Sequence, residues 1–166
     1  WSSDVVSSDL PFQSHHQIPL KYGSNKMRGA QIVVVETPEG QMQLVHFHLG
    51  LTDTLRHWQV NHVLDHHLFR EGSHLPSIIV GDSNDWSNKL HRGPFAQHGY
   101  VQVTTPPFRF RSFPAYLAIV SLDKAFDRGG IIIRPAHIVR SRIAKQASYH
   151  RPPAHHFHQT KLGNNT

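Results

Sequence analysis

The chain has 166 residues, 38% of them apolar, and a formal charge of +6 with His counted as neutral. This size and composition fit one globular domain and exclude fibrous, disordered and membrane-spanning classes. Cysteine is absent, which excludes disulfides, thiolate zinc sites and cysteine nucleophiles. The first ten residues lack the basic and apolar regions of a signal peptide, and the compartment stays open. The positive charge favours a polyanionic partner, although ordinary solvated surface explains it equally well.

Two strands and a tight turn are predicted first along the chain. Residues 31–36 and 43–49 are rich in Val, Leu and Phe, as strands are. Thr37-Pro38-Glu39-Gly40 lies between them and supplies Pro and Gly where a chain reversal needs them. The pattern predicts a β-hairpin.

A helix is predicted over residues 54–70, which contain neither Gly nor Pro. Its expected buried face carries apolar residues at helical spacing: Val60, Val63, Leu64 and Leu68. Three large side chains fall off this face: Leu55, Trp58 and Phe69. Gly72 supplies a helix stop.

The rest of the chain predicts mainly strands. Residues 77–80 form a short apolar strand of the kind that is buried on both faces. Further candidate strands are residues 99–103, 121–126, 131–134 and 137–141, with Pro- and Gly-containing turns between them. Residues 153–166 are expected to be a flexible tail. The order of elements predicts an α+β fold.

The segment from Ile78 to Trp86 is the most informative for chemistry, because an apolar strand ends there in acidic and amide side chains. Asp82 and Asn84 lie two residues apart, so an extended backbone projects both to the same side. They could hold an oxygen-liganded metal, an attacking water or a phosphate. The alternative is an Asx turn that caps the next element.

Five motifs in order resemble the endonuclease/exonuclease/phosphatase superfamily. The Gly-Asp-x-Asn of residues 81–84 follows an apolar strand, as in that family. The other motifs are His-Leu-Gly-Leu at 48–51 with Arg56 and Gln59, Ser-Phe-Pro at 112–114, Leu-Asp-x-x-Phe at 122–126, and Ser-Tyr-His-x-Pro at 148–152. The resemblance spans residues 28–152.

The resemblance implies a partial four-layer α/β/β/α sandwich with two mainly antiparallel sheets, in a single domain over residues 1–166. It also implies truncation at the N-terminus, because the family's catalytic glutamate and an early asparagine belong to strands preceding the matched region. The resemblance implies hydrolysis of phosphoric esters, with Mg²⁺ or Mn²⁺ neutralising the scissile phosphate. The implied substrate is a nucleic acid or a phospholipid head group.

Family positions imply a role for each matched residue. His150 would be the general base, and His48 would contact the phosphate. Asp82 would orient the water or help bind the metal, Asn84 would donate to a phosphate oxygen, and Asp123 would be a second carboxylate near the metal. His46 lies two residues before His48 and has no family role.

One residue departs from the family pattern and one segment bears on the substrate. Tyr149 stands where the family has an aspartate beside the histidine base, and a phenol does not supply that charge at neutral pH. Between residues 90 and 111, Arg109 and Arg111 lie among aromatic residues, which suits substrate binding or, alternatively, core plus solvated charge.

Two other functional classes stay open from sequence. A non-catalytic polyanion-binding module of the same fold is favoured by Tyr149 and by the positive charge. A loose transition-metal binder is suggested by four histidines: His150, His155, His156 and His158. A serine hydrolase and a P-loop nucleotidase are excluded, because neither Gly-x-Ser-x-Gly nor the phosphate-binding loop motif occurs.

Overall fold

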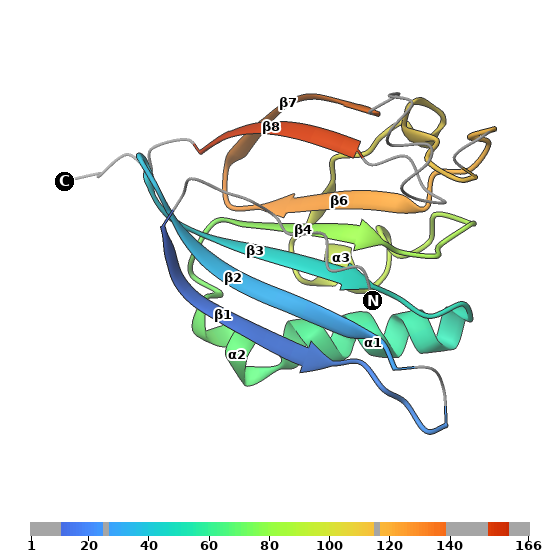
Figure 1. The fold of residues 1–166 in the computed structure, drawn as a ribbon, viewed down its shortest axis with the longest axis horizontal. Coiled ribbons are helices and arrows are strands. Elements are labelled where there is room, and N and C mark those ends of the chain that lie inside the picture. Colours follow the sequence, from blue (N-terminus) through green and yellow to red (C-terminus); the bar gives the residue numbers. More distant parts are fainter. Residues whose placement is uncertain (1–10, 25–26, 115–116, 139–152, 160–166) are drawn as a thin grey trace.

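A computed structural model describes residues 11–24, 27–114, 117–138 and 153–159, with the backbone alone for 132–138 and 153–159. Figure 1 shows the arrangement of its elements. In chain order these are β1 (Phe12–Pro19), β2 (Gly29–Thr37), β3 (Gly40–His48), α1 (Asp53–Asp65), α2 (His67–Glu71), β4 (Ser77–Asp82), α3 (Pro94–Gln97), β5 (Val101–Gln102), the 3₁₀ helix η1 (Pro107–Phe110), β6 (Asp123–Arg128), β7 (Ile131–Ile138) and β8 (Pro153–Gln159).

The described strands form two sheets. The larger has the order β1-β2-β3-β4-β6-β5, and β7 pairs with β8 in the other. β3 and β4 are parallel, whereas every other described pair of neighbouring strands is antiparallel. A parallel pair needs a long crossover connection, which α1 and α2 provide. The carboxyl ends of β3 and β4 therefore lie at one end of the large sheet, where β6 begins (Figure 1).

The predicted hairpin is confirmed as β2 and β3, which pair from Ala30 and Phe47 to Thr37 and Gly40. Gly40 adopts φ +126°, a backbone conformation that residues other than glycine rarely adopt. β1 was not predicted, because its sequence alternates little in polarity and has Ile18 as its single buried residue. It pairs along β2 and extends the sheet.

The predicted helix is two helices that meet at His66. Thr52 caps the start of α1 through its side chain, and His66 has an extended backbone that ends α1. The His66 ring then accepts from the Leu68 amide and caps α2, which ends at Gly72. The chain changes direction at this break, and Phe69 is buried. The prediction that Phe69 lies off the buried face is therefore wrong.

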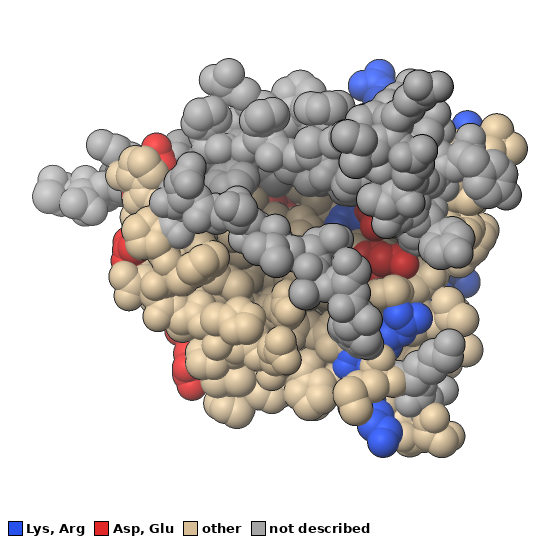
Figure 2. Space-filling model, in the orientation of Figure 1, with Lys and Arg blue, Asp and Glu red and all other residues tan. Residues whose placement is uncertain are grey.

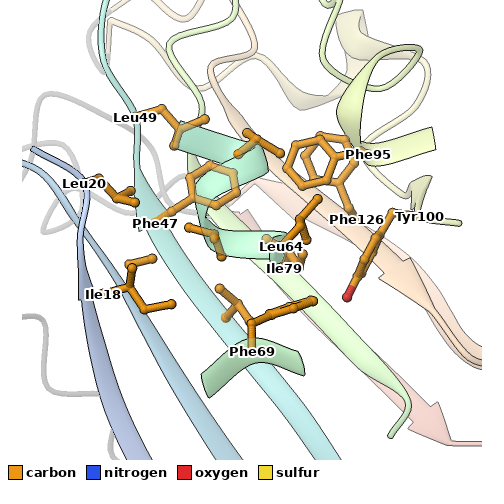
Figure 3. Close-up of a cluster of buried hydrophobic side chains, with 14 of the residues drawn as sticks. Ile18, Leu20, Phe47, Leu49, Leu64, Phe69, Ile79, Phe95, Tyr100 and Phe126 are labelled. Carbon is orange, nitrogen blue, oxygen red and sulfur yellow. The ribbon is translucent and has the colours of Figure 1, made fainter. Parts of the chain in front are cut away.

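The main core lies between α1, α2 and α3 and one face of the large sheet, as Figure 3 shows. Phe126 of β6 is fully buried and stacks on Phe95 of α3, with ring centroids 3.8 Å apart. Phe47 of β3 stacks on the same Phe95 ring at 6.2 Å. Val60, Val63 and Leu64 face this core as predicted, and Leu68 packs against it partly buried.

The opposite face of the large sheet carries a second, smaller cluster. Its buried members are Val35, Met42, Ile78 and Ile131, so the start of β7 packs on the face that the helices leave open. Because side chains alternate along a strand, each of β2, β3 and β4 contributes residues to both clusters. β4 is apolar on both faces near its start, as predicted.

Several predictions for the second half need correction. Residues 131–134 and 137–141 were expected as separate strands, but one strand, β7, spans Ile131–Ile138. Within the expected strand 99–103, only Val101–Gln102 pair, at the edge of the sheet. The expected tail is wrong for Pro153–Gln159, because the backbone of β8 satisfies its hydrogen bonds against β7.

The mixed helix and strand class is confirmed, and the four-layer sandwich stays a prediction. Within the described ranges, no helix is both long enough and apolar enough to span a membrane.

Candidate functional site

Three of the predicted site residues form one row across adjacent strands. His48 of β3 lies beside Asp82 of β4 in parallel register, and Asp82 lies opposite Asp123 of β6. Asp82 shares its strand face with Ile78 and not with the residues that face the helices, so the row lies on the sheet face away from the helices. His48 Nε2 and Asp82 Oδ2 are 3.3 Å apart, and Asp82 is mostly buried. We call these three residues the polar row.

The backbone fixes the spacing of the polar row. Gly81 precedes Asp82, pairs with Phe47 and has φ +147°. A Cβ atom at Gly81 would lie 1.9 Å from the carbonyl oxygen of Phe47, so only glycine fits there. The two strands therefore approach closely one residue before His48 and Asp82.

Arg28 joins the polar row from the chain just before β2. Its Nη1 atom lies 2.6 Å from His48 Nε2, the same nitrogen that faces Asp82. An imidazole nitrogen either accepts a hydrogen bond or carries a proton, so Nε2 satisfies one of these two neighbours at a time. Figure 2 shows acidic and basic side chains close together in this region of the surface, where β3 and β4 end.

Asn84 is held in a fixed position after β4. Its backbone amide donates to Asp82 Oδ1 at 2.9 Å, which is the Asx turn considered from sequence. Its side-chain amide donates to the carbonyl oxygen of Leu49 at 2.9 Å and so ties this loop to the end of β3. The residue is buried and has φ +48°, which Asn tolerates better than most residues.

A buried ion pair supports the loop from the helix side of the sheet. Lys124 Nζ donates to the Asp85 carbonyl oxygen at 2.8 Å and to its Oδ2 atom at 3.2 Å. Asp85 also accepts from the Leu90 amide. Burial alone raises the pKa of the Asp85 carboxyl, but the Leu90 amide and the Lys124 ammonium outweigh it and hold that pKa below its usual range. Asp85 follows Asn84 in the loop after β4, and Lys124 follows Asp123 of the polar row in β6. The ion pair therefore positions this loop and the start of β6.

Arg56 and Gln59, matched to the family from sequence, are buried and structural. Arg56 donates to the Leu51 carbonyl oxygen at 2.6 Å and pairs with Asp53. Gln59 accepts from the Gly50 amide and donates to the Leu20 carbonyl oxygen. They fix the connection after β3, and with it the end of the strand that carries His48.

The other predicted residues are distributed differently. Phe95, Tyr100 and Phe110 of the Arg- and aromatic-rich segment are buried, so the core interpretation holds for them, whereas Phe108 is exposed. Arg109 and Arg111 are exposed, on η1 and directly after it. His150 and Tyr149 lie outside the described residues, as do the side chains of His155, His156 and His158.

Sequence reasoning missed Arg28, Asp85 and Lys124. The Asp85–Lys124 contact joins residues 39 positions apart, which no local pattern reveals. A lysine inside an apolar strand pattern, between Leu122 and Phe126, was the available signal that it needs a buried partner.

A rival hollow lies elsewhere on the surface. It has a volume of about 430 Å³ and is lined by Trp58, Asn61, His62, Asp65 and His66 on the outer side of α1. The Trp58 and His62 rings stack with centroids 4.7 Å apart, and His62 meets His66 edge-on at 5.7 Å. Burial lowers the pKa of His66, and His67 and His62 lower it further. This hollow is lined by one carboxylate, Asp65, and its aromatic and imidazole rings contact one another. We therefore assign it no chemistry.

The polar row supplies some of the ligands that a divalent cation needs, but not a complete set. Among the described residues, no group of three His, Asp or Glu side chains could enclose a metal ion. Mg²⁺, however, is commonly held by one or two carboxylates, with water and substrate phosphate completing its shell. Asp82 and Asp123, opposite each other on neighbouring strands, supply such a pair of hard oxygen donors.

Comparisons with known proteins point to one fold. No protein-family model matches the sequence, and the comparison with curated proteins also gives no match. Among solved structures, a mannosyl-6-phosphatase of Bacteroides thetaiotaomicron has a TM-score of 0.70 at 13% identity, over 89% of this chain and 67% of that one. An endonuclease/exonuclease/phosphatase of Beutenbergia cavernae has a TM-score of 0.62 at 21% identity, over 86% of this chain and 44% of that one.

A truncated TDP2 of Caenorhabditis elegans is also similar, with a TM-score of 0.63 at 16% identity, over 83% of this chain and 61% of that one. The chain therefore spans between 44 and 67% of the length of these three structures. The likeness confirms the endonuclease/exonuclease/phosphatase fold that the sequence motifs predicted, without confirming the four-layer sandwich. At these identities it establishes the fold alone.

Proposed function

We propose, from the endonuclease/exonuclease/phosphatase fold of this chain, that it supports divalent-metal-dependent hydrolysis of phosphoric esters. The polar row carries the proposal, because it brings a histidine and two carboxylates together on one sheet face. Hydrolysis of a phosphoric ester needs positive charge at the phosphate and a positioned water, more than a covalent nucleophile.

Asp82 and Asp123 would hold the cation, which would neutralise charge on the phosphate when bound. Asp82 is additionally kept in place by the amide of Asn84 at 2.9 Å. The Oδ1 atom of Asp82 thus accepts the hydrogen bond that orients the carboxylate, while its Oδ2 atom faces His48. The four-layer sandwich and the Mg²⁺ or Mn²⁺ requirement belong to this proposal.

His48 and Arg28 would bind the phosphate. Because His48 Nε2 cannot satisfy both Arg28 and Asp82, one contact is released whenever the other forms. A phosphate oxygen would draw the Arg28 guanidinium to itself, since charge-assisted bonds to phosphate are stronger than a bond to neutral imidazole. His48 would then donate from Nε2 to a phosphate oxygen. Asn84 would direct the second hydrogen of its side-chain amide to the phosphate as well.

His150 is the proposed general base, from its family position alone. A nearly neutral imidazole pKa suits the abstraction of a proton from water. Its role is separable from that of the polar row, because His150→Asn should remove the base and leave metal binding at Asp82 and Asp123 intact.

Two substrate classes follow from the similar proteins. The mannosyl-6-phosphatase acts, by its name, on a phosphate ester of a sugar, and a Danio rerio TDP2 of the same fold is complexed with a single-stranded DNA product. We carry over to this chain the common chemistry, hydrolysis of a phosphoric monoester or diester. A phospholipid head group, the other substrate considered beside nucleic acid, rests on the motif resemblance alone. The comparisons do not favour the non-catalytic binding module.

The test is hydrolysis of a small soluble ester, bis(p-nitrophenyl) phosphate or p-nitrophenyl phosphate, with Mg²⁺ or Mn²⁺ and with EDTA. We expect metal-dependent turnover that falls by at least about 100-fold in Asp123→Asn, since the second carboxylate is removed. Asp127→Asn is the matched control, because Asp127 lies on the same face of β6 at its other end. Turnover that survives EDTA, or an equal loss in both variants, would overturn the proposal.

A further inference from the structure

Five large apolar side chains are exposed in the segments that follow β3 and β4 or precede β6. Their exposed fractions are 70% for Leu51, 58% for Trp86, 63% for Phe108, 62% for Leu117 and 57% for Ile119. We call this set the apolar rim. Single exposed apolar residues are ordinary, but a group of them at one place on a protein marks an interaction surface.

Topology places the apolar rim at the end of the sheet that carries the polar row. Leu51 follows β3 and Trp86 follows β4, and these parallel strands end at the same edge. Leu117 and Ile119 precede β6, which begins at that edge with Asp123. In Figure 1 these connections lie together on the right of the view, beyond the tips of β3 and β4.

The rim residues are held on ordered backbone. Phe113 and Val120 pair as an antiparallel bridge, and the Ile119 amide donates to the Phe113 carbonyl oxygen at 2.9 Å. The Trp86 ring packs edge-on against Phe113, with centroids 6.0 Å apart. Leu117 and Ile119 are therefore exposed beside the Phe113–Val120 bridge, which Trp86 contacts from the neighbouring loop.

Positive charge accompanies the rim. Arg109 and Arg111 are exposed beside Phe108, and Arg109 lies over the Phe108 ring at 5.9 Å. Within the described part of the chain, no carboxylate forms an ion pair with either arginine. Apolar side chains flanked by Arg match an anionic bilayer surface, where the apolar groups enter the interface and the cations meet head groups.

Composition separates a bilayer from a nucleic acid as the partner. Nucleobases bind by stacking on aromatic rings, and the backbone needs a track of cations. Three of the five rim residues are aliphatic Leu or Ile, which offer no stacking face. The hydrocarbon of a bilayer accounts for the aliphatic rim residues, and its anionic head groups account for the flanking arginines.

We propose that the apolar rim docks the chain on anionic phospholipid bilayers, with the polar row facing the head groups. The substrate class, a phosphoric ester in a phospholipid head group, rests on the proposed function. The docking itself rests on the rim and is measured without turnover.

The test is sedimentation of the chain with vesicles of phosphatidylcholine containing about one-third phosphatidylglycerol, against pure phosphatidylcholine vesicles. We expect binding to the anionic vesicles that weakens with salt. In the combined variant Trp86→Ser, Leu117→Ser and Ile119→Ser, the partition coefficient should fall at least about tenfold.

The matched control combines Phe12→Ser and Val101→Ser. These side chains are 57% and 67% exposed, but they pair with Val35 and Asp127, at the opposite end of the sheet. The control should bind within about twofold of the unaltered chain. Circular dichroism should match in all three proteins, and the unfolding midpoint should change little, since every altered side chain is more than half exposed.

Docking is overturned if the chain does not bind vesicles, or if the rim and control variants lose binding equally. Tight binding of single-stranded DNA that the rim variant weakens, without vesicle binding, would assign the rim to nucleic acid. Hydrolysis of the small soluble ester separates the two proposals: turnover without vesicle binding refutes docking alone, and vesicle binding without turnover refutes the proposed function alone.

Discussion

The two faces of the large sheet differ in what their side chains do, although the same strands supply both. Toward the helices, β6 places Lys124 and Phe126, both buried and closely packed. On the other face it places Asp123 and Asp127, both partly exposed. Alternation along one strand thus separates the residues that maintain the fold from those that face the exterior.

This separation predicts opposite consequences for neighbouring residues. A change on the helix face should alter the free energy of unfolding, whereas a change in the polar row should alter chemistry with little effect on stability.

Phe126→Ala should lower the free energy of unfolding by about 4 kcal/mol, because it leaves a cavity against Phe95 in a packed core. Urea denaturation monitored by circular dichroism measures this. Asp127→Asn, one residue away on the other face, should change it by less than about 0.5 kcal/mol. Similar losses in the two variants would contradict the division between faces.

Lys124→Met should cost about 3 kcal/mol, because it leaves the Asp85 carboxylate buried without its cation. The same denaturation experiment applies. The double variant Lys124→Met and Asp85→Asn should lose less than the sum of the two single variants, since the uncompensated charge is gone. Additive losses would show that the two residues act independently.

Asn84→Gly should cost about 1 kcal/mol, because glycine keeps the positive φ but loses the hydrogen bond to Leu49. Asn84→Ala should cost roughly a further 1 kcal/mol, since alanine is strained in that conformation. The difference between the two variants in denaturant unfolding measures the net cost of a Cβ atom at this positive φ, after the lower unfolded-state entropy of alanine is included. An equal cost would mean that the backbone of the alanine variant has relaxed.

The smallest effect is a dependence on acid pH that belongs to Asp85. Its folded-state pKa is lowered, so the unfolded chain takes up the proton first as the pH falls. The stability from the ionised carboxyl is present above the unfolded pKa of about 3.9 and is lost as the pH falls toward the folded value. Unfolding midpoints against pH should show this loss in the unaltered chain, and Asp85→Asn should lack that share of it.

The sequence predicted what depends on local patterns. The hairpin, the first helix and β4 have long apolar periodicities or turn residues, and all three were found. The helix break at His66 and the pairing of β8 were missed, because a capping geometry and a distant partner strand decide them. No local pattern encodes either.

The polar row was predictable for a related reason. Asp82 and Asn84 follow an apolar strand directly, and strand ends are where polar side chains gather. Arg28 was not predictable, because it reaches His48 only through the pairing of β2 with β3. The aromatic residues of segment 90–111 were ambiguous from sequence because aromatic rings serve cores and binding surfaces alike.

Gly81 has a consequence for how this chain tolerates mutation. Because a Cβ there would meet the Phe47 carbonyl oxygen at 1.9 Å, backbone atoms set the separation of His48 and Asp82. Loss of side-chain packing elsewhere can lower the yield of folded chain without changing that separation. In a saturation mutagenesis screen, position 81 should therefore score as strictly intolerant, like a catalytic residue, while offering no chemical group of its own.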